Sequence, residues 1–166
     1  FGHPVDMDPV LKISEKYNLK IIEDCAEAHG VEYKGKKVGS IGDIGAFSFF
    51  ANKTITCGEG GIIVTNSKEL AEKARSLKNL SYGKVKKFLH DDIGFNYRLP
   101  NISAALGLGQ FSQKDEIFSK KKKIYNRYKK NLKNVKGINI PVVREWVTKY
   151  IMWVFNLHLD NNFPIK

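Results

Sequence analysis

The sequence contains only two cysteines, Cys25 and Cys57, and their spacing matches neither a disulfide framework nor a zinc motif. Small secreted scaffolds depend on several disulfides, so this scarcity favours a reduced, cytoplasmic setting. Long apolar runs are also missing. The run from Ile44 to Phe50 is far shorter than the roughly 20 residues that a membrane-spanning helix needs. The first residues form neither a basic nor an apolar leader, and we therefore expect no signal peptide and no membrane partner.

The composition indicates an ordinary globular protein without a metal. The chain has 166 residues, of which 42% are hydrophobic and 11% aromatic, which is enough for one domain with a packed core. No cluster of cysteine and histidine is present, and the four histidines are scattered, at positions 3, 29, 90 and 158. This dispersion predicts no metal site.

The net charge of +11 is concentrated in one segment. Residues 112–137 hold ten basic and two acidic residues, which accounts for most of the excess. Such a segment is typical of a nucleic-acid-binding arm. The same segment also has apolar residues at helical spacing, which favours an amphipathic helix with a solvated lysine face; these residues are Ile117, Ile124, Tyr128, Leu132 and Val135. We favour the second interpretation and expect no nucleic-acid partner.

The first half of the chain alternates helical and strand patterns. Asp8 is a suitable N-cap and Pro9 suits the first helical position, and Asn18 closes the helical pattern. The pattern then predicts a buried strand at 19–22 that ends in Glu23 and Asp24, a loop or hairpin at 30–42, and strands at 44–50 and 61–65. Only about ten residues separate the last two strands, so we expect them to pair antiparallel.

The second half is predicted to be mainly helical before it returns to strands. Ser67 is a suitable cap for a helix, and residues 79–96 are irregular and polar. A further helix is expected from Asn101, either ending before the basic segment or continuing into it, with Gly107 and Gly109 marking a kink or a close contact. Strands are expected at 138–143 and 150–159.

Two side chains at predicted strand ends indicate a chemistry. In α/β sheets, ligands bind beyond the carboxyl ends of the strands, and both Asp24 and Lys53 fall at such places. A lysine amine can form an imine with a carbonyl cofactor. A carboxylate that faces a pyridine nitrogen keeps it protonated, so that the ring can accept electrons. Alone, this pair is also compatible with a solvated lysine and an aspartate that caps a turn.

A series of motifs makes the interpretation more specific. The chain resembles the DegT/DnrJ/EryC1/StrS family of sugar aminotransferases, which have the fold-type-I architecture of aspartate aminotransferase. The resemblance runs from about Gly2 to Gln110 and continues more loosely to the end. It is carried by five segments in order: residues 23–30 (EDCAEAHG), 39–43 (GSIGD), 47–53 (FSFFANK), 58–66 (GEGGIIVTN) and 94–98 (GFNYR).

The resemblance implies a cofactor, pyridoxal 5′-phosphate, and a role for each of five residues. Lys53 would form the imine with the cofactor and carry the proton, and Asp24 would pair with the pyridine nitrogen. Glu27 would lie near the ring oxygen, Ser48 would bind the phosphate, and Asn96 would reach the phosphate in the neighbouring subunit of a homodimer. From the residues alone, Ser48 could be an alternating strand residue, Glu27 a surface residue and Asn96 a turn former.

The wording of the motifs is most similar to the perosamine synthase branch of this family. The resemblance implies transfer of an amino group from an amino acid, which is glutamate in that branch, to a GDP-linked 4-keto-6-deoxy sugar. The implied partners are therefore a nucleotide sugar and an amino-acid donor. Two alternatives remain: an inactive or complementing fragment of such an enzyme, and a basic nucleic-acid-binding protein.

The resemblance also implies a division of the chain, which would be a central fragment of a longer enzyme. Residues 1–111 would be part of a cofactor-binding large domain, an α/β unit with a mixed, mostly parallel sheet. Residues 112–137 would be a long basic connecting helix. Residues 138–166 would begin a small α+β domain.

Overall fold

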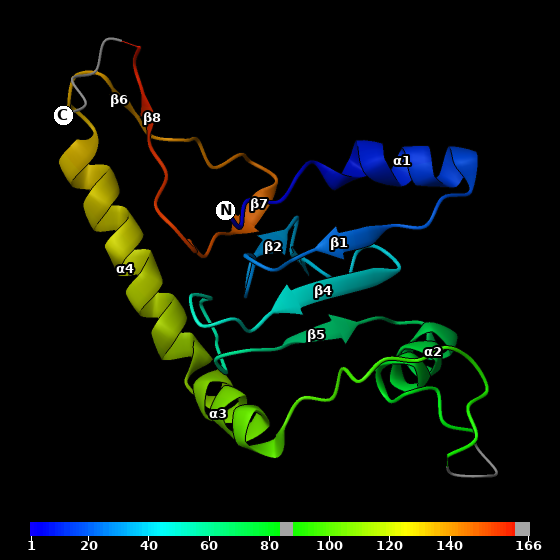
Figure 1. The fold of residues 1–166 in the computed structure, drawn as a ribbon. Coiled ribbons are helices and arrows are strands. Elements are labelled where there is room, and N and C mark those ends of the chain that lie inside the picture. Colours follow the sequence, from blue (N-terminus) through cyan, green and yellow to red (C-terminus); the bar gives the residue numbers. More distant parts are fainter. Residues whose placement is uncertain (84–87, 162–166) are drawn as a thin grey trace.

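The computed structural model describes residues 1–83 and 88–161, and its central element is a mixed sheet (Figure 1). The sheet has the order β1-β4-β5, with β1 at Ile22–Asp24, β4 at Ile44–Ser48 and β5 at Gly61–Val64. β1 and β4 are parallel, whereas β4 and β5 are antiparallel. The predicted α/β class and the antiparallel connection are therefore confirmed.

Helix α1, Met7–Tyr17, precedes the sheet and has well-defined ends. Its N-cap is Asp6, whose side chain accepts a hydrogen bond from the N–H of Asp8, so the prediction of Asp8 as the cap was wrong by two residues. Asn18 ends the helix, as the sequence predicted, and the structure shows it in the left-handed conformation, with φ of 49°. The strand predicted at 19–22 lies later, in β1, with Glu23 and Asp24 at its C-terminal end as the sequence predicted, but Ile22 is 71% exposed, so the prediction of a buried strand was wrong.

The glycine-rich segment after β1 forms the predicted hairpin. β2, Glu32–Tyr33, pairs antiparallel with β3, Lys36–Lys37, and Gly35 has φ of 80° at the turn between them. The other edge of β2 pairs with β7, Val147–Lys149, from the far end of the chain. The hairpin therefore joins the N-terminal and C-terminal parts of the molecule.

The core lies around this hairpin and not around the sheet as a whole. The buried cluster consists of Met7, Cys25, Ala28, Val31, Tyr33, Val38 and Ile151. On one face of the sheet, by contrast, Ile22 is 71% exposed and Ile63 is 55% exposed. In register, Ile22 and Asp24 share this open face with Ala46 and Ser48.

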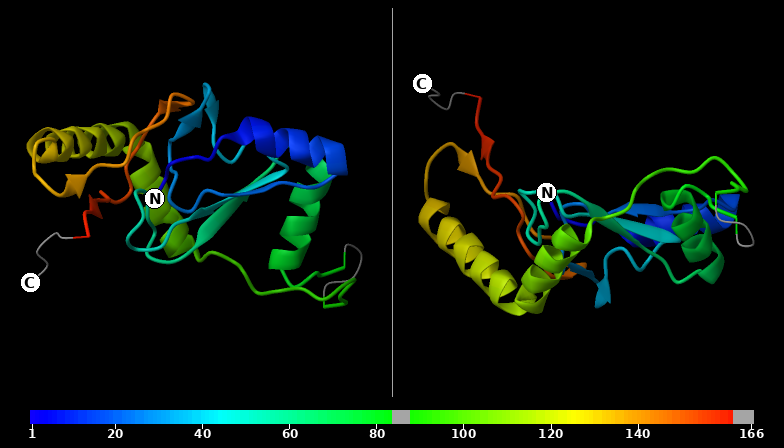
Figure 2. Two further views of the ribbon diagram at one scale, coloured as in Figure 1. Left: turned by 90° about the horizontal axis from the view of Figure 1, so that it is seen from above. Right: turned by 60° about the horizontal axis from the view of Figure 1, so that its bottom comes forward.

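Three further helices complete the described fold. α2, Lys68–Lys78, begins at the predicted cap, since the Ser67 side chain accepts a hydrogen bond from the N–H of Leu70. α3, Asn101–Ser112, and α4, Lys114–Leu132, are separate helices that meet at Gln113, so the continuous helix considered for this region is interrupted there. Figures 1 and 2 place α2 at the end of the sheet where β4 begins, and α4 beyond the end where β4 stops.

The face of α4 that packs against the protein overlaps the predicted face only in part. The half-buried residues of the helix include two of the predicted ones: they are Lys114, Ile117, Phe118, Lys121, Tyr125 and Leu132. Tyr128 is 49% exposed but stacks on Phe155 with ring centroids 4.8 Å apart, whereas Ile124 is 45% exposed. Tyr125, which was not among the predicted residues, is covered because the rings of Tyr150 and Phe155 lie 5.4 Å and 5.8 Å from it.

The two C-terminal strands are much shorter than predicted. β6, Ile138–Asn139, pairs antiparallel with β8, His158–Leu159, and residues 150–157 are irregular. The apolar alternation at 150–159 was misleading because the consecutive residues Ile151 and Met152 are both buried, which a strand with one buried face does not allow. The predictions for 79–96 and 138–166 extend to residues 84–87 and 162–166, which lie outside the described residues.

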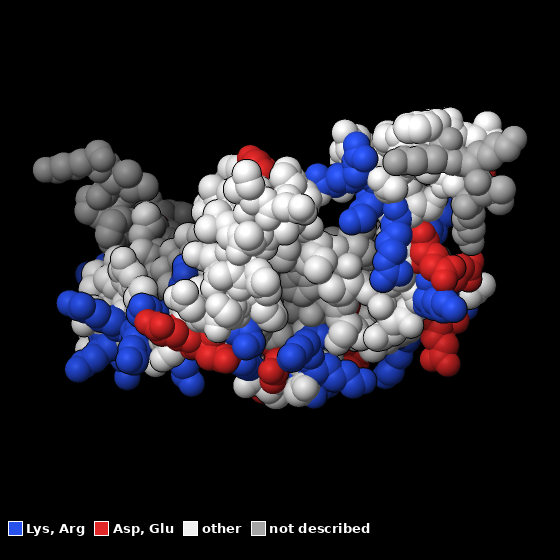
Figure 3. Space-filling model, turned by 90° about the horizontal axis from the view of Figure 1, so that it is seen from below, with Lys and Arg blue, Asp and Glu red and all other residues white. Residues whose placement is uncertain are grey.

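The surface of the chain is unevenly charged. Figure 3 shows basic side chains at the rim formed by α4 and a broad uncharged area in the middle, where α3 lies. The α3 sequence contains no charged residue, and its large apolar side chains are exposed: Ile102, Leu106, Leu108 and Phe111. The positive charge and the apolar surface therefore belong to different helices.

Two glycines give a test of the fold. A Cβ added at Gly45 would lie 2.4 Å from the Cα and from the carbonyl oxygen of Gly39, and backbone atoms cannot move aside cheaply. Gly45→Ala should therefore lower the free energy of unfolding by about 2–3 kcal/mol. A Cβ at Gly109 on α3 meets nothing within 4 Å, so Gly109→Ala should raise that free energy by up to about 1 kcal/mol. Urea unfolding measures both free energies. Equal effects of the two substitutions would contradict the close approach of Gly39 to Gly45.

Candidate active site

Asp24 and Ser48 project from the same face at the carboxyl ends of two parallel strands. Asp24 is opposite Ala46 in the register, and the N–H of Cys25 donates to the carbonyl of Ala46 at 2.8 Å. Ser48 follows Ala46 by two residues and therefore shares its face. The carboxylate of Asp24 is exposed, and one of its oxygens accepts a hydrogen bond from the N–H of Ala26 at 3.0 Å.

Lys53 lies in the turn that follows β4, where the N–H of Lys53 donates to the carbonyl of Phe50 at 2.9 Å. Its side chain is only 11% exposed. The Nζ atom is 3.7 Å from the carboxylate of Glu27, so the structure brings these two predicted site residues together. Ser48 precedes the turn, and its Oγ accepts a hydrogen bond from the N–H of Phe50 at 3.2 Å.

Trp153 is a site residue that sequence reasoning missed. Its ring lies 4.0 Å from Nζ of Lys53, measured to the centroid, and its indole N–H donates to the carbonyl of Asn52 at 2.8 Å. A cation close to an indole face is electrostatically stabilised. Trp153 therefore covers the lysine from the C-terminal segment. The sequence offered no local signal for this contact, because 100 positions separate the two residues.

Glu23 is a second residue whose role the sequence did not reveal. Its side chain is buried, and its two carboxylate oxygens accept hydrogen bonds of 2.7 Å from the backbone N–H groups of Gly39, Ile41 and Gly42. Three donors compensate the cost of burying the carboxylate. Glu23 thereby ties the turn at 39–42 to β1, directly before Asp24.

His29 lies buried beside the lysine turn. Its Nδ1 accepts a hydrogen bond from the N–H of Ile55 at 3.2 Å, which leaves the proton of a neutral ring on Nε2. Burial and, to a smaller extent, the Lys53 ammonium lower the pKa of His29 from 6.5 to about 4, although the Ser48 carbonyl acts in the opposite direction. His29 is therefore neutral at physiological pH.

Asn96 lies at the other end of the sheet from Lys53. It forms a bridge with Asn79, and its neighbour Tyr97 donates to the carbonyl of Lys78, at the end of α2. Its side-chain oxygen accepts a hydrogen bond of 2.7 Å from the guanidinium of Arg98. Figure 1 shows α2 on the far side of the sheet from the carboxyl end of β4. The described chain thus does not bring Asn96 to the other four predicted site residues.

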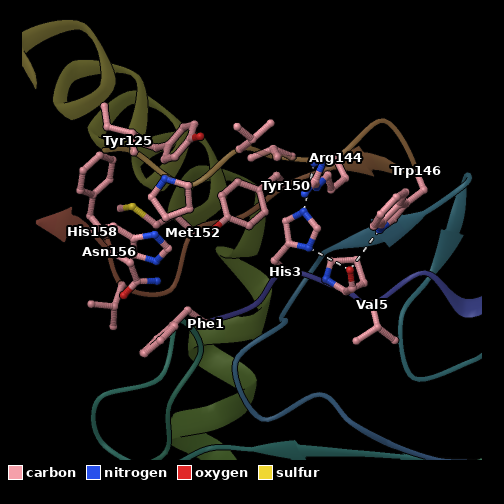
Figure 4. Close-up of a pocket in the computed structure, with 17 residues that line it drawn as sticks. Phe1, His3, Val5, Tyr125, Arg144, Trp146, Tyr150, Met152, Asn156 and His158 are labelled. Carbon is pink, nitrogen blue, oxygen red and sulfur yellow. Dashed lines mark hydrogen bonds between the residues drawn. The ribbon is translucent and has the colours of Figure 1, made fainter. Parts of the chain in front are cut away.

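Two hollows flank this region. One, of about 490 Å³, is lined by Asp24 and Glu27 together with the N-terminal segment. The other, of about 510 Å³, is lined by aromatic and aliphatic residues of the C-terminal segment together with the first residues of the chain (Figure 4). At its wall, Nε2 of His3 accepts a hydrogen bond from the N–H of Arg144. None of the five predicted site residues lines the second hollow.

Other kinds of site receive no support within residues 1–83 and 88–161. No group of three or more histidine, cysteine or acidic side chains is arranged to hold a metal ion there. Nor is any helix in those ranges long and apolar enough to cross a bilayer. Cys25 and Cys57 are both free and buried, and burial raises the pKa of the Cys25 thiol to about 12.

The side chains at the carboxyl edge of the sheet suit a phosphorylated pyridine aldehyde. They provide a shielded primary amine on Lys53, a carboxylate on Asp24 and a hydroxyl on Ser48, and the last two share one face. These are the groups that bind the aldehyde carbon, the ring nitrogen and the phosphate of such a cofactor. The fold and these residues fit the class of α/β enzymes that use pyridoxal phosphate.

The comparison with protein families agrees with this class. The model of the DegT/DnrJ/EryC1/StrS aminotransferase family matches residues 1–164, and the chain belongs to this family. It is 49% identical over 135 residues to a GDP-perosamine synthase of Escherichia coli O157:H7, which covers 81% of this chain and 37% of that protein. It is 39% identical to a GDP-perosamine synthase of Caulobacter vibrioides, over 96% of this chain and 43% of that protein.

Solved structures show the same fold. Streptomyces venezuelae DesV, in complex with a ketimine intermediate, superposes with a TM-score of 0.88 at 33% identity, over 98% of this chain and 43% of that chain. Helicobacter pylori PseC, an aminotransferase of pseudaminic acid biosynthesis, gives a TM-score of 0.79 at 34% identity, over 84% and 38%. The chain thus spans less than half the length of these proteins.

The Glu23 cluster predicts a stability effect. Glu23→Gln would turn an amide N–H₂ toward backbone donors and remove the charge, so the free energy of unfolding should fall by about 2 kcal/mol. Glu15→Gln on exposed α1 is the matched control and should change it little. Urea unfolding at neutral pH compares them. Equal effects of the two substitutions would show that the cluster contributes nothing.

His29 predicts a pH dependence. Because its folded pKa is about 4 and its unfolded value 6.5, the unfolded chain binds the proton more readily between these pH values. The contribution of neutral His29 is therefore complete above about pH 6.5 and lost as the pH falls toward 4. Urea unfolding across this window should show a steeper loss of stability in the wild type than in His29→Phe. Parallel stability curves for the wild type and His29→Phe would contradict this role of His29.

Proposed function

We propose that the chain is part of a pyridoxal-phosphate-dependent aminotransferase that acts on a nucleotide sugar. The observation that carries this proposal is the position of Lys53, whose amine is shielded beside Glu27 and under Trp153. It lies at the edge of the sheet where Asp24 and Ser48 project from one face. Membership of an aminotransferase family supports the same chemistry.

Each residue has a proposed task. Lys53 binds the cofactor through its amine and moves the proton between the two carbons that exchange the amino group. Asp24 keeps a proton on the ring nitrogen, and Ser48 donates its hydroxyl to the phosphate. Glu27, which is 3.7 Å from Nζ, orients the lysine near the ring oxygen. When bound, the cofactor supplies a pyridinium ring that accepts electron density from the reacting carbon.

Trp153 has a task that follows from its position. Its ring lies over the lysine amine, and its N–H holds the backbone of the residue before the lysine. It therefore keeps water from one side of Nζ and limits the directions in which the side chain can extend. Excluding water strengthens the electrostatic interactions around a reacting group.

We propose a GDP-linked 4-keto-6-deoxy sugar as the acceptor and an amino acid, glutamate, as the donor. Two relatives named GDP-perosamine synthase support the acceptor, at 49% and 39% identity. The donor rests on the resemblance to that branch. A purified enzyme that aminates a UDP- or dTDP-linked keto sugar but not the GDP-linked one would refute the choice of acceptor.

We further propose that the complete enzyme is a homodimer with a shared site. Asn96 is exposed and lies at the opposite end of the sheet from Lys53, which suits a residue that serves a neighbouring subunit. The exposed apolar residues of α3 suit a contact surface.

Two sequence-based predictions stay predictions. They are the division of the chain into domains at residues 111 and 137 and the cytoplasmic setting.

The test of this proposal is the absorbance of the lysine–cofactor imine near the edge of the visible range. A polypeptide of the relatives' length should develop this band with pyridoxal 5′-phosphate, and Lys53→Ala should abolish it. Lys36→Ala, which removes an exposed lysine of β3, should leave it unchanged. The isolated 166-residue chain should show a weak band or none, because it spans less than half of its relatives.

A band that persists in Lys53→Ala would contradict the assigned lysine. A salt-sensitive, sequence-independent affinity for DNA without any cofactor band would instead favour the nucleic-acid alternative based on the basic face of α4.

A further inference from the structure

The imidazole of His29 occupies an aromatic site between two phenylalanines of one strand end. Its ring stacks on Phe47, with centroids 5.7 Å apart and planes 14° apart, and on Phe49, with values of 5.8 Å and 28°. These two phenylalanines flank Ser48 in the sequence. The histidine is only 6% exposed. Its position is therefore fixed relative to the strand end that carries the serine.

The same ring also holds the lysine turn. Nδ1 accepts a hydrogen bond from the N–H of Ile55, two residues after Lys53, at 3.2 Å. Ile55 is itself buried, at 3% exposed, so its N–H needs an acceptor inside the protein. The imidazole meets that need, and it thereby joins the lysine turn to the end of β4.

A phenylalanine would fill this site at lower cost if packing were the only requirement. Nε2 of His29 is buried and has no well-formed hydrogen bond among the described residues, although the Ser48 carbonyl interacts with the ring, and an under-satisfied buried N–H is destabilising. What the imidazole adds over a phenyl ring is the acceptor at Nδ1. The low pKa keeps the ring neutral, which preserves that acceptor and avoids a second cation beside Lys53.

We propose that His29 is a positioning residue for Lys53. It links the lysine turn, through Ile55, to the phenylalanines on both sides of Ser48, and so fixes the amine relative to the serine hydroxyl. The significance of this link for catalysis rests on the proposed function, but the link itself is a property of the protein without cofactor. His29 does not touch the reacting atoms in this account.

The decisive comparison is between His29→Asn and His29→Gln. Both replace the ring with an amide and lose the stacking, but asparagine places its oxygen near the position of Nδ1, whereas glutamine reaches toward the position of Nε2. The asparagine variant should keep the bond to Ile55, and the glutamine variant should lose it. Val31→Ala, at a core residue that is 1% exposed, serves as a variant of lowered stability with the histidine intact.

Two measurements on the protein without cofactor test the link. Amide hydrogen exchange of residues 53–57 should be about fivefold faster in His29→Gln than in His29→Asn, as expected for one lost hydrogen bond. Acylation of Lys53 by limiting acetic anhydride, relative to exposed Lys36, should rise in the glutamine variant and stay near the wild-type ratio in Val31→Ala. Mass spectrometry of peptides measures both the amide exchange and the acylation of the lysines.

Equal exchange and equal labelling in the asparagine and glutamine variants would overturn the proposal, as would a rise in Lys53 labelling in Val31→Ala of the same size. The cofactor band of the wild type separates the two hypotheses. If the wild type forms no band but the glutamine variant loosens the lysine turn, the positioning role stands and the proposed function fails. If the band forms and the variants do not differ, the proposed function stands and the positioning role fails.

Discussion

The geometry of the candidate site depends on one buried charge, the carboxylate of Glu23. Three backbone N–H groups from the turn at 39–42 converge on it, each at 2.7 Å. Without these donors, a buried carboxylate would be strongly unfavourable, so the turn and β1 have to fold together. The same segment, 39–42, also packs on Phe47 of β4, because a side chain at Gly39 would collide with the phenylalanine ring. The parallel strands that present Asp24 and Ser48 are held in register by this contact.

Polar anchors thus occur on both sides of the segment that carries Asp24 and Glu27. Glu23 precedes Asp24 and binds the turn, whereas His29 follows Glu27 and binds the lysine turn through Ile55. Between them, the carboxylate of Glu27 reaches Nζ of Lys53. The site is therefore assembled from short segments that are tied together by backbone hydrogen bonds to buried side chains, and much of the apolar core lies elsewhere, around the hairpin.

Sequence reasoning recovered features that are encoded locally. The Ser67 cap, the helix end at Asn18 and the antiparallel pairing of β4 with β5 follow from residue type and from the length of a connection. The strand predicted at 150–159 is reduced to His158–Leu159, because Ile151 and Met152 are both buried and Phe155 packs on Tyr125 of α4. Asp24 and Lys53 were suggested by their places at strand ends, but the roles of Glu27, Ser48 and Asn96 came only from family resemblance. Trp153 and Ile55 could not be foreseen, because their contacts with Lys53 and His29 join distant segments.

The most direct test of the central claim is to locate the lysine that binds the cofactor. A polypeptide of the relatives' length is incubated with pyridoxal 5′-phosphate, reduced with borohydride to fix the lysine–cofactor bond, and digested for peptide mass spectrometry. Lys53 is expected to be the one modified lysine, at stoichiometric yield. Modification spread over exposed lysines such as those of α4, with Lys53 unmodified, would contradict it.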